Sequence, residues 1–214
     1  METREVRAEM EPTERADQEK AIAAALAREA FSEAGALALR AYGPEILGLL
    51  VAVMRDERTA TEVFSQFSED LWLGLPKFRG PSSIRTWAYS LAHQAAHRWR
   101  RDPLRRRAVN FDDCPELFEV EARVRTETLS RVRTEVKDRM HQLREQLSPD
   151  EQLLLALRID REMKWEDIVE ITFGECDDRT RARHVSSLRK RFERIELRLR
   201  TAFETDPSLR RRRG

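Results

Sequence analysis

The stretch that decides the fold reads KFRGPSSIRTWAYSLAHQAAHRWRR, from Lys77 to Arg101. Ser82 or Ser83 can cap a helix here, and Pro103 prevents that helix from continuing. Its apolar side chains recur every three or four residues and make one stripe: Ile84, Trp87, Ala88, Leu91, Ala95 and Trp99. The other face is polar and basic. The pattern predicts an amphipathic helix that follows a short loop and ends in arginines.

Just upstream, a second amphipathic helix carries acidic groups instead. Thr59 and Glu62 form a capping-box signature, and Pro76 ends the run. Its apolar stripe comprises Val63, Phe64, Phe67, Leu71 and Leu75. Its polar face comprises Glu62, Gln66, Glu69 and Asp70. This face is either only solvated or docks a basic partner, and the residues alone favour neither reading.

A third, apolar helix is predicted before these two. Pro44 suits its first turn, and it reaches Met54.

Composition favours helices throughout. A charged fraction of 37%, with 7 Gly and 8 Pro in 214 residues, is typical of helices with long solvated faces. Cys114 and Cys176 are isolated, so the sequence indicates no disulfide framework, no zinc site and no other cofactor. The longest apolar run, Ile46 to Met54, is shorter than the roughly 20 residues of a membrane span. With no signal peptide at the start, we expect a soluble cytoplasmic protein without a membrane partner.

The chain divides into two small helical domains, so the predicted fold class is all-α. Residues 1–35 form a charged, alanine-rich extension, 36–101 the first domain, 102–122 a linker, 123–205 the second domain and 206–214 a basic tail. In the second domain, Ser148-Pro149-Asp150-Glu151 is a complete helix start. A short helix near Trp165, a break over 172–180 and a long basic helix follow, which predicts a helix-turn-helix.

The last helix presents cations away from its apolar stripe, as binding to phosphates and base edges requires. The residues concerned are Arg181, Arg183, His184, Ser187, Lys190, Arg191 and Arg194. A solvated helix face is the alternative, but the short helix and break directly before it favour DNA binding.

In the first domain, Trp87 and Tyr89 point in different directions on one helix. Trp87 falls on the apolar stripe and is expected to pack in the core. Tyr89 and the loop before the helix are better placed to meet nucleobases, and Phe78 and Arg79 could serve either role.

His93 and His97 stand four residues apart, the spacing of the HExxH zinc motif. Gln94 occupies the place of the general base, however, and a glutamine cannot take a proton from water. We therefore predict that these histidines are polar groups on a DNA-facing surface. Arg98, Arg100 and Arg101 extend that surface. The sequence shows no phosphate loop or nucleophile elbow, and no catalytic residue is predicted.

Two blocks resemble the sigma-70 superfamily, within it the extracytoplasmic-function group of sigma factors. The first runs from Tyr42-Gly43-Pro44-Glu45 through Ala60 to Gln66, Leu71-Trp72, Phe78-Arg79-Gly80 and Ser83 to Tyr89, and is similar to conserved region two. The second runs from Leu147 to Gln152, through Trp165-Glu166-Asp167-Ile168 and the basic helix, and is similar to region four. The blocks span about 125 residues in the family's order.

The resemblance implies an initiation factor that binds core RNA polymerase, directs it to promoter DNA and helps to open it. Region two would bind the β′ clamp helices and melt the minus-ten element, and region four would read the minus-35 element and touch the β flap. Carried over by position, the clamp contacts would be Glu62, Gln66, Glu69 and Asp70. The minus-ten and melting contacts would be Arg79, Gly80, Ser82, Ser83, Tyr89, His93, Gln94, His97, Arg98, Arg100 and Arg101. The minus-35 contacts would be Arg181, Arg183, His184, Ser187, Lys190 and Arg191.

This sequence departs from the family's pattern at several positions. Glu62 and Ser65 stand where Asp-x-x-Gln is common, and Gln94 and Arg98 where Asn-x-x-x-Asp is usual, so the promoter sequence does not carry over. The break over 172–180 is also longer than the family's turn. The resemblance admits an anti-sigma protein as a further partner. A stand-alone helix-turn-helix regulator and, more remotely, a metal-dependent hydrolase using His93 and His97 are the alternatives.

Overall fold

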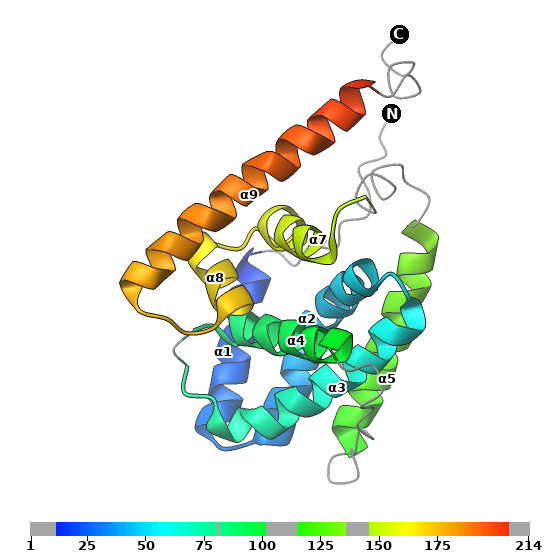
Figure 1. Cartoon of the computed structure of the whole chain (residues 1–214). Helices are drawn as coiled ribbons and strands as arrows, with labels where there is room; N and C mark the ends of the chain where they lie inside the picture. Colours follow the sequence, from blue (N-terminus) through cyan, green and yellow to red (C-terminus); the bar gives the residue numbers. More distant parts are fainter. Residues whose placement is uncertain (1–11, 81, 102–114, 136–145, 206–214) are drawn as a thin grey trace.

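A computed structural model describes residues 12–80, 82–101, 115–135 and 146–205, and every element in these ranges is helical (Figure 1). The longer elements are α1 (Pro12–Ala27), α2 (Phe31–Met54), α3 (Glu57–Gly74), α4 (Ile84–Arg101), α5 (Pro115–Glu135), α7 (Pro149–Leu155), α8 (Trp165–Phe173) and α9 (Asp178–Thr205). A 3-10 turn, η1 (Leu75–Lys77), follows α3, and a π-helical turn, η2 (Ala156–Asp160), follows α7. The all-α prediction is confirmed.

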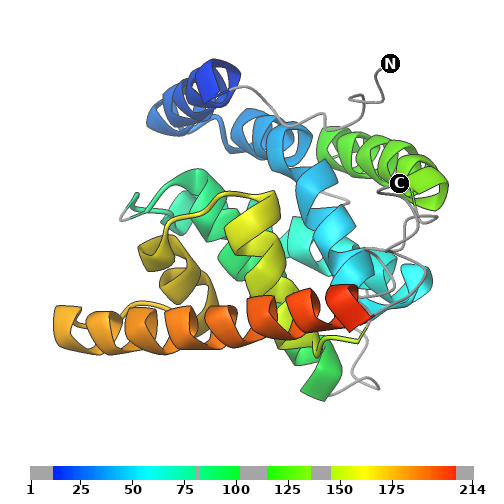
Figure 2. The same cartoon turned by 90° about the horizontal axis from the view of Figure 1, so that it is seen from above.

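Helix α2 is the centre of the first unit and packs against α1, α3, α4 and α5. Figure 2 shows α1 and α5 on either side of it. Pro44 lies in the interior of α2 instead of its first turn, so the predicted start near Pro44 was wrong. The helix begins at Phe31 because Ala34, Ala38 and Leu39 extend the buried stripe towards the N-terminus. Phe31–Met54 is long and apolar enough to cross a membrane, but 56% of its apolar window is buried, as expected of a core helix.

Helix α3 begins one turn earlier than its sequence signature indicates. Asp56 is the N-cap, and its carboxylate accepts a hydrogen bond of 2.7 Å from the backbone N–H of Thr59. A carboxylate favours this position because it also meets the positive end of the helix dipole. The predicted cap at Thr59 was therefore displaced by three residues. The apolar stripe is confirmed, since all its members are buried: Val63, Phe64, Phe67, Leu71 and Leu75.

Helix α4 is capped by Ser83, whose hydroxyl accepts a 3.0 Å hydrogen bond from the backbone N–H of Thr86. The small side chains Ala88, Ala92, Ala95 and Ala96 are buried, which lets neighbouring helices approach α4 closely. Trp87 is partly buried, as its place on the stripe predicts. Its ring packs on Phe78, with 5.0 Å between centroids, and closes against Gly74, where a Cβ would lie 2.7 Å from the indole.

Helix α5 packs against α2 and α3, so it belongs spatially to the first unit. Leu117 lies against Gly35, and Val124 lies so close to Gly43 that an added Cβ would be only 2.9 Å away. The predicted boundaries placed 115–122 in the linker and the rest of this helix in the second domain. The structure instead places α5 with the first unit, because the glycines of α2 leave room for its apolar stripe. This packing joins residues that are far apart in the sequence.

The second unit consists of α7, η2, α8 and α9. The capping box at Ser148 and Glu151 is confirmed, with both reciprocal hydrogen bonds formed. Helix α8 ends at Phe173 and α9 begins at Asp178, so the break covers 174–177 and is shorter than the predicted 172–180. Gly174, at φ +79°, turns the chain, and the carboxylate of Asp177 accepts from the N–H of Thr180 at 2.9 Å, which starts α9 early.

The two units pack together. Helix α8 lies against α4, and α7 lies against α2, while both also contact α9. In Figure 1, α7 and α8 therefore separate the long rod of α9 from the first bundle.

Candidate nucleic-acid and polymerase interfaces

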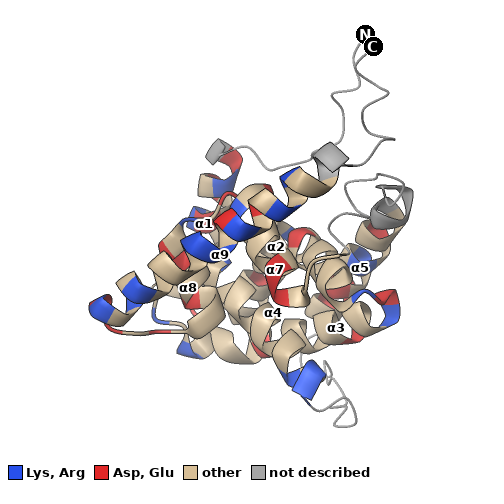
Figure 3. Cartoon of the chain, turned by 45° about the horizontal axis from the view of Figure 1, so that its top comes forward, with Lys and Arg blue, Asp and Glu red and all other residues tan. Residues whose placement is uncertain are grey.

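Helix α9 presents an open basic surface. Its apolar stripe, Leu188, Phe192 and Ile195, is buried towards α8, and Phe192 meets Trp165 edge-on at 5.6 Å between centroids. The predicted minus-35 residues lie away from this stripe. Arg181, Arg183, Ser187 and Lys190 are exposed, and His184 and Arg191 are partly exposed. Figure 3 shows lysine and arginine distributed along this helix.

Three contacts hold the start of this surface in place. The ring of His184 stacks on Phe173, with centroids 4.0 Å apart and planes at 16°. Arg181 donates to the carbonyl of Cys176 at 3.3 Å and lies 3.9 Å from a carboxylate oxygen of Asp178. These groups are oriented without being covered, so they can still meet a phosphate or a base edge.

The loop before α4 is accessible. Arg79, Gly80 and Ser83 are exposed and Ser82 is partly exposed, while Pro81 lies outside the described residues. Gly80 has a φ of +72°, which a residue with a side chain would rarely adopt. The Arg79 guanidinium donates to the carbonyl of Pro76 at 3.0 Å. The loop is thus shaped by its own backbone and presents one cation to solvent.

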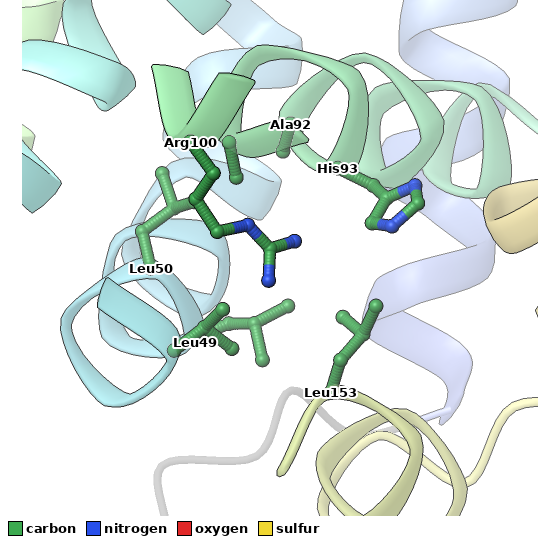
Figure 4. A pocket seen from close by; sticks show the side chains of 8 residues that line it. Leu49, Leu50, Ala92, His93, Arg100 and Leu153 are labelled. Carbon is green, nitrogen blue, oxygen red and sulfur yellow. The ribbon is translucent and has the colours of Figure 1, made fainter. Parts of the chain in front are cut away.

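The polar residues of α4 divide between two faces. Gln94, His97, Arg98 and Arg101 are exposed, as a strand-binding surface requires. His93 and Arg100 are only partly exposed, because they turn towards α7 and α8. In Figure 4 both side chains point into a small cavity that Leu49, Leu50 and Leu153 also line. Its volume is about 10 Å³, close to the room that one water molecule needs.

Charges around this cavity act on His93. Burial lowers the pKa of His93, and the nearby Arg100 and His97 lower it further, while Asp150 and a hydrogen bond at Ile171 oppose them. Arg100 itself lies 3.3 Å from a carboxylate oxygen of Asp150, on α7. The lowered pKa favours the neutral form of His93, and this side chain faces the second unit.

Tyr89 does not lie where the sequence suggested. It is 1% exposed, and its hydroxyl donates a 2.9 Å hydrogen bond to Glu45. Burial raises its pKa well above the ordinary range, and the charge of Glu45 adds to that effect. The expectation that this ring faces nucleobases is corrected for this arrangement, because α2 and the second unit cover the side of α4 on which it lies.

The acidic residues of α3 form an interlinked and only partly exposed group. Gln66 donates to Glu69 at 2.7 Å and to Asp70 at 3.2 Å, and Glu62 lies 3.4 Å from Arg58. Asp70 is also paired with Arg98 of α4. Burial raises the pKa of Asp70 despite that arginine. Gln66, Glu69 and Asp70 are therefore joined directly, and Glu62 lies one turn before Gln66 on the same helix.

Ser65, at a position where this sequence departs from the family pattern, has a specific partner. Its hydroxyl donates a 2.9 Å hydrogen bond to Glu121 of α5. Glu121 is 1% exposed and its pKa is raised by burial, with Ser65 and Arg125 opposing the rise. The Ser65 hydroxyl therefore helps to hold α5 against α3.

The two histidines of α4 form no evident metal site. Their ring centroids are 6.3 Å apart. Within the described ranges, no group of three or more His, Cys, Asp or Glu side chains is arranged to hold a metal ion. The hydrolase alternative therefore has no candidate third ligand among these residues.

A polar cluster that sequence reasoning missed joins the two units. Glu45 accepts from Arg85 at 3.2 Å and from Tyr89, and it lies 3.8 Å from the Nε of Arg161 in the second unit. Glu19 of α1 completes the cluster by accepting from the backbone N–H of Arg85 at 3.2 Å. No spacing signal could have found it, since its members lie on α1, α2, α4 and the segment after η2.

Comparison with known proteins identifies the chain. Residues 38–107 match the family model for sigma-70 region 2. The chain is 30% identical to RNA polymerase sigma factor YlaC of Bacillus subtilis over 142 residues, which cover 62% of this chain and 75% of that protein. It is also 30% identical to RNA polymerase sigma-H factor of Pseudomonas aeruginosa over 139 residues, 61% of this chain and 70% of the relative. No solved structure matches significantly. The chain belongs to the sigma-70 family of RNA polymerase sigma factors and acts in transcription initiation.

Proposed function

We propose that this sigma factor divides its work among three surfaces. The acidic face of α3 binds the β′ clamp helices of core RNA polymerase. The loop from Arg79 to Ser83, with the exposed side of α4, holds the unpaired strand of the minus-ten element. The basic face of α9 binds the minus-35 duplex, and the protein acts in the cytoplasm, where it catalyses no reaction itself.

The observation that carries this proposal is that an acidic face on α3 and a basic face on α9 lie on different helices. Glu62, Glu69 and Asp70 lie on one face of α3, whereas the exposed cations of α9 lie on the second unit. A polyanion and a protein partner can then be bound at once without competing for one surface. An anti-sigma protein would be a further partner, competing for either surface.

The experiment is start-site-specific transcription in vitro with purified core polymerase and a genomic promoter library. The chain should co-purify with core and direct transcripts from a subset of promoters. If it instead binds duplex DNA tightly alone, and neither binds core nor starts transcripts, it is a stand-alone regulator and the proposal is wrong.

A charge reversal tests the polymerase surface within the same assay. Glu62→Lys with Glu69→Lys should weaken core binding at least tenfold, because both side chains lie off the buried stripe of α3. Glu116→Lys with Glu119→Lys is the matched control, since both are exposed on α5 and the charge change is the same. Equal affinity of the two double variants would show that the acidic face of α3 is only solvated.

A further inference from the structure

The first turn of α4 has no carboxylate of its own. Helix N-termini favour negative charge, because the first backbone N–H groups have no partner within the helix and form the positive end of its dipole. This turn carries a cation, Arg85, instead. The Ser83 hydroxyl accepts from the backbone N–H of Thr86, and the Ser83 carbonyl accepts from that of Trp87 at 3.0 Å. The backbone N–H of Arg85 bonds to a group outside the helix.

That group is the carboxylate of Glu19 on α1. Its Oε1 accepts a 3.2 Å hydrogen bond from the backbone N–H of Arg85, which lies 66 residues further along the chain. The same oxygen accepts from the hydroxyl of Tyr42 on α2 at 2.6 Å. A carboxylate that accepts from a backbone N–H at a helix start makes a charge-assisted hydrogen bond, which is stronger than a neutral one. Helix α1 therefore caps α4 from another part of the chain.

The packing of α1 places this carboxylate. Ile22 and Ala25 follow Glu19 at helical spacing and are buried, and α1 packs along α2 and also contacts α4. The connection from α1 to α2 is short, since it covers only 28–30. Burial raises the pKa of Tyr42 well above the ordinary range, and Glu19 adds to the rise. The phenol thus stays protonated and donates to Glu19, which orients the carboxylate towards α4.

The loop from Arg79 to Ser83 depends on this first turn at both of its ends. Before the loop, the ring of Phe78 packs on Trp87, with 5.0 Å between centroids. At its end, Ser83 is itself the N-cap of α4. The hydroxyl oxygen of Ser82 is buried without a hydrogen-bond partner in the described part of the chain, so it adds no further anchor. A displacement of the first turn of α4 would therefore move the whole loop.

We propose that Glu19 is a positioning residue for promoter opening: by capping α4, it fixes the loop from Arg79 to Ser83 in the shape that receives the unpaired strand. The part of the loop in strand binding rests on the proposed function, whereas the capping contact is a property of the free chain. Glu19 acts through the backbone of Arg85 and does not itself contact DNA. The charged N-terminal extension thereby belongs to the machinery that opens the promoter.

The alternative is that Glu19 only joins α1 to α2 through Tyr42. The two hydrogen bonds of its Oε1 allow these roles to be separated. Tyr42→Phe removes the bond to α2 and leaves the bond to α4, so it is the matched control, whereas Glu19→Ala removes both bonds. Glu19→Gln keeps an amide oxygen that can accept from the Arg85 N–H but loses the charge, so its effects should lie between the other two.

The first test is amide hydrogen exchange of the free chain, followed by NMR. Glu19→Ala should speed exchange at Arg85, Thr86 and Trp87 roughly fivefold, a change typical of a lost helix cap. Tyr42→Phe should leave these three amides unchanged. Helix content and thermal unfolding show whether each variant is folded, and Glu19→Gln carries the test if Glu19→Ala is not. Unchanged exchange in both Glu19 variants, or equal acceleration in Tyr42→Phe, overturns the inference.

The second test measures promoter opening by holoenzyme assembled from core polymerase and the full chain. The template is a promoter that the transcription assay yields, with 2-aminopurine in the minus-ten element to report unstacking. Glu19→Ala should slow opening several-fold without changing the affinity for the closed duplex, because the surfaces of α3 and α9 are intact. Tyr42→Phe should open the promoter at the unmodified rate, a difference that a merely structural role of Glu19 would not produce.

Failure of this inference can be told apart from failure of the proposed function. If the unmodified holoenzyme opens the promoter and Glu19→Ala opens it equally fast, Glu19 is only a structural cap and the inference is wrong. If the unmodified chain opens no promoter with core polymerase, the proposed function fails, and the exchange rates of the free chain still decide whether Glu19 caps α4.

Discussion

Helices α4 and α9 carry similar basic sequences but lie in different surroundings. On α9 the cations stay exposed, because only its apolar stripe is packed. On α4 one polar side is open, while the side with Tyr89 and His93 is covered by α2, α7 and α8. A basic amphipathic pattern thus predicts the helix and its apolar side. Whether its polar side is free depends on elements far away in the sequence.

The largest effect should come from the covered side of α4. Tyr89→Ala should destabilise the fold by about 3–5 kcal/mol, because it removes a fully buried aromatic ring and leaves a cavity. Tyr89→Phe should cost only about 1 kcal/mol, since Glu45 keeps Arg85 and Arg161 as partners. Urea unfolding measures both values. If Tyr89→Ala unfolds like the unmodified protein, the ring is not a core residue and the comparison is wrong.

The open surface of α9 should respond in DNA binding and not in stability. Arg183→Ala with Lys190→Ala should lower the salt slope of holoenzyme binding to promoter DNA by about two, and the affinity roughly 30-fold at 0.15 M salt. The unfolding free energy should hardly change, because both side chains are exposed. Lys20→Ala with Arg28→Ala, on the first unit, is the control for lost charge. An equal loss in the control would mean that α9 has no special place in binding.

Lowering the pH should destabilise the packing on the covered side of α4 before it affects the open side. Burial lowers the pKa of His93 in the folded chain, whereas the unfolded chain titrates near 6.5. His93 therefore contributes stability above about pH 6.5 that is lost as the pH falls. The groups facing it are Arg100, His97 and Asp150. The thermal midpoint should decline between pH 7.5 and 5.5, and His93→Gln should flatten that decline. A profile that His93→Gln leaves unchanged, or that His97→Gln flattens equally, contradicts the assignment.

The smallest effect should come from the ion pair between the partly buried Asp70 of α3 and the exposed Arg98 on the open side of α4. Asp70→Asn or Arg98→Ala should change the unfolding free energy by at most about 1 kcal/mol, because water already solvates Arg98. Asp70→Asn should still weaken core binding if the acidic face of α3 is the clamp contact. Loss of stability well above that value would show that this pair is structural instead.

Features decided by nearby residues could be predicted from the sequence. The stripe of α3 and the capping box at Ser148 needed only local spacing and hydrogen bonding, and both are confirmed. The N-cap of α3 was predicted at Thr59 but lies at Asp56, whose carboxylate accepts the hydrogen bond from the Thr59 backbone. This error is local, because the two residues lie only one turn apart. The exposure of Arg181, Arg183 and Lys190 on α9 also followed from the pattern, since none of the described elements buries them.

Features that depend on contacts between residues far apart in the sequence could not be predicted from it. The docking of α5 depends on Gly35 and Gly43, which look unremarkable in a long apolar helix. The burial of Tyr89 depends on Glu45 and on a second unit that begins some 60 residues after it along the chain. Arg161 stands in a segment with no motif, yet it supplies the contact that fastens the two units.

The covering of α4 in the free chain can be tested most directly by modifying the histidines with diethylpyrocarbonate at neutral pH and locating the product by mass spectrometry. His93 and His97 are one turn apart on the same helix, so each serves as the control for the other. The reagent attacks neutral imidazole, and a lowered pKa would by itself make His93 react faster. We predict that His93 is modified several-fold more slowly than His97 in the free chain and that the difference shrinks when core polymerase is bound. Equal rates in the free chain would contradict the account.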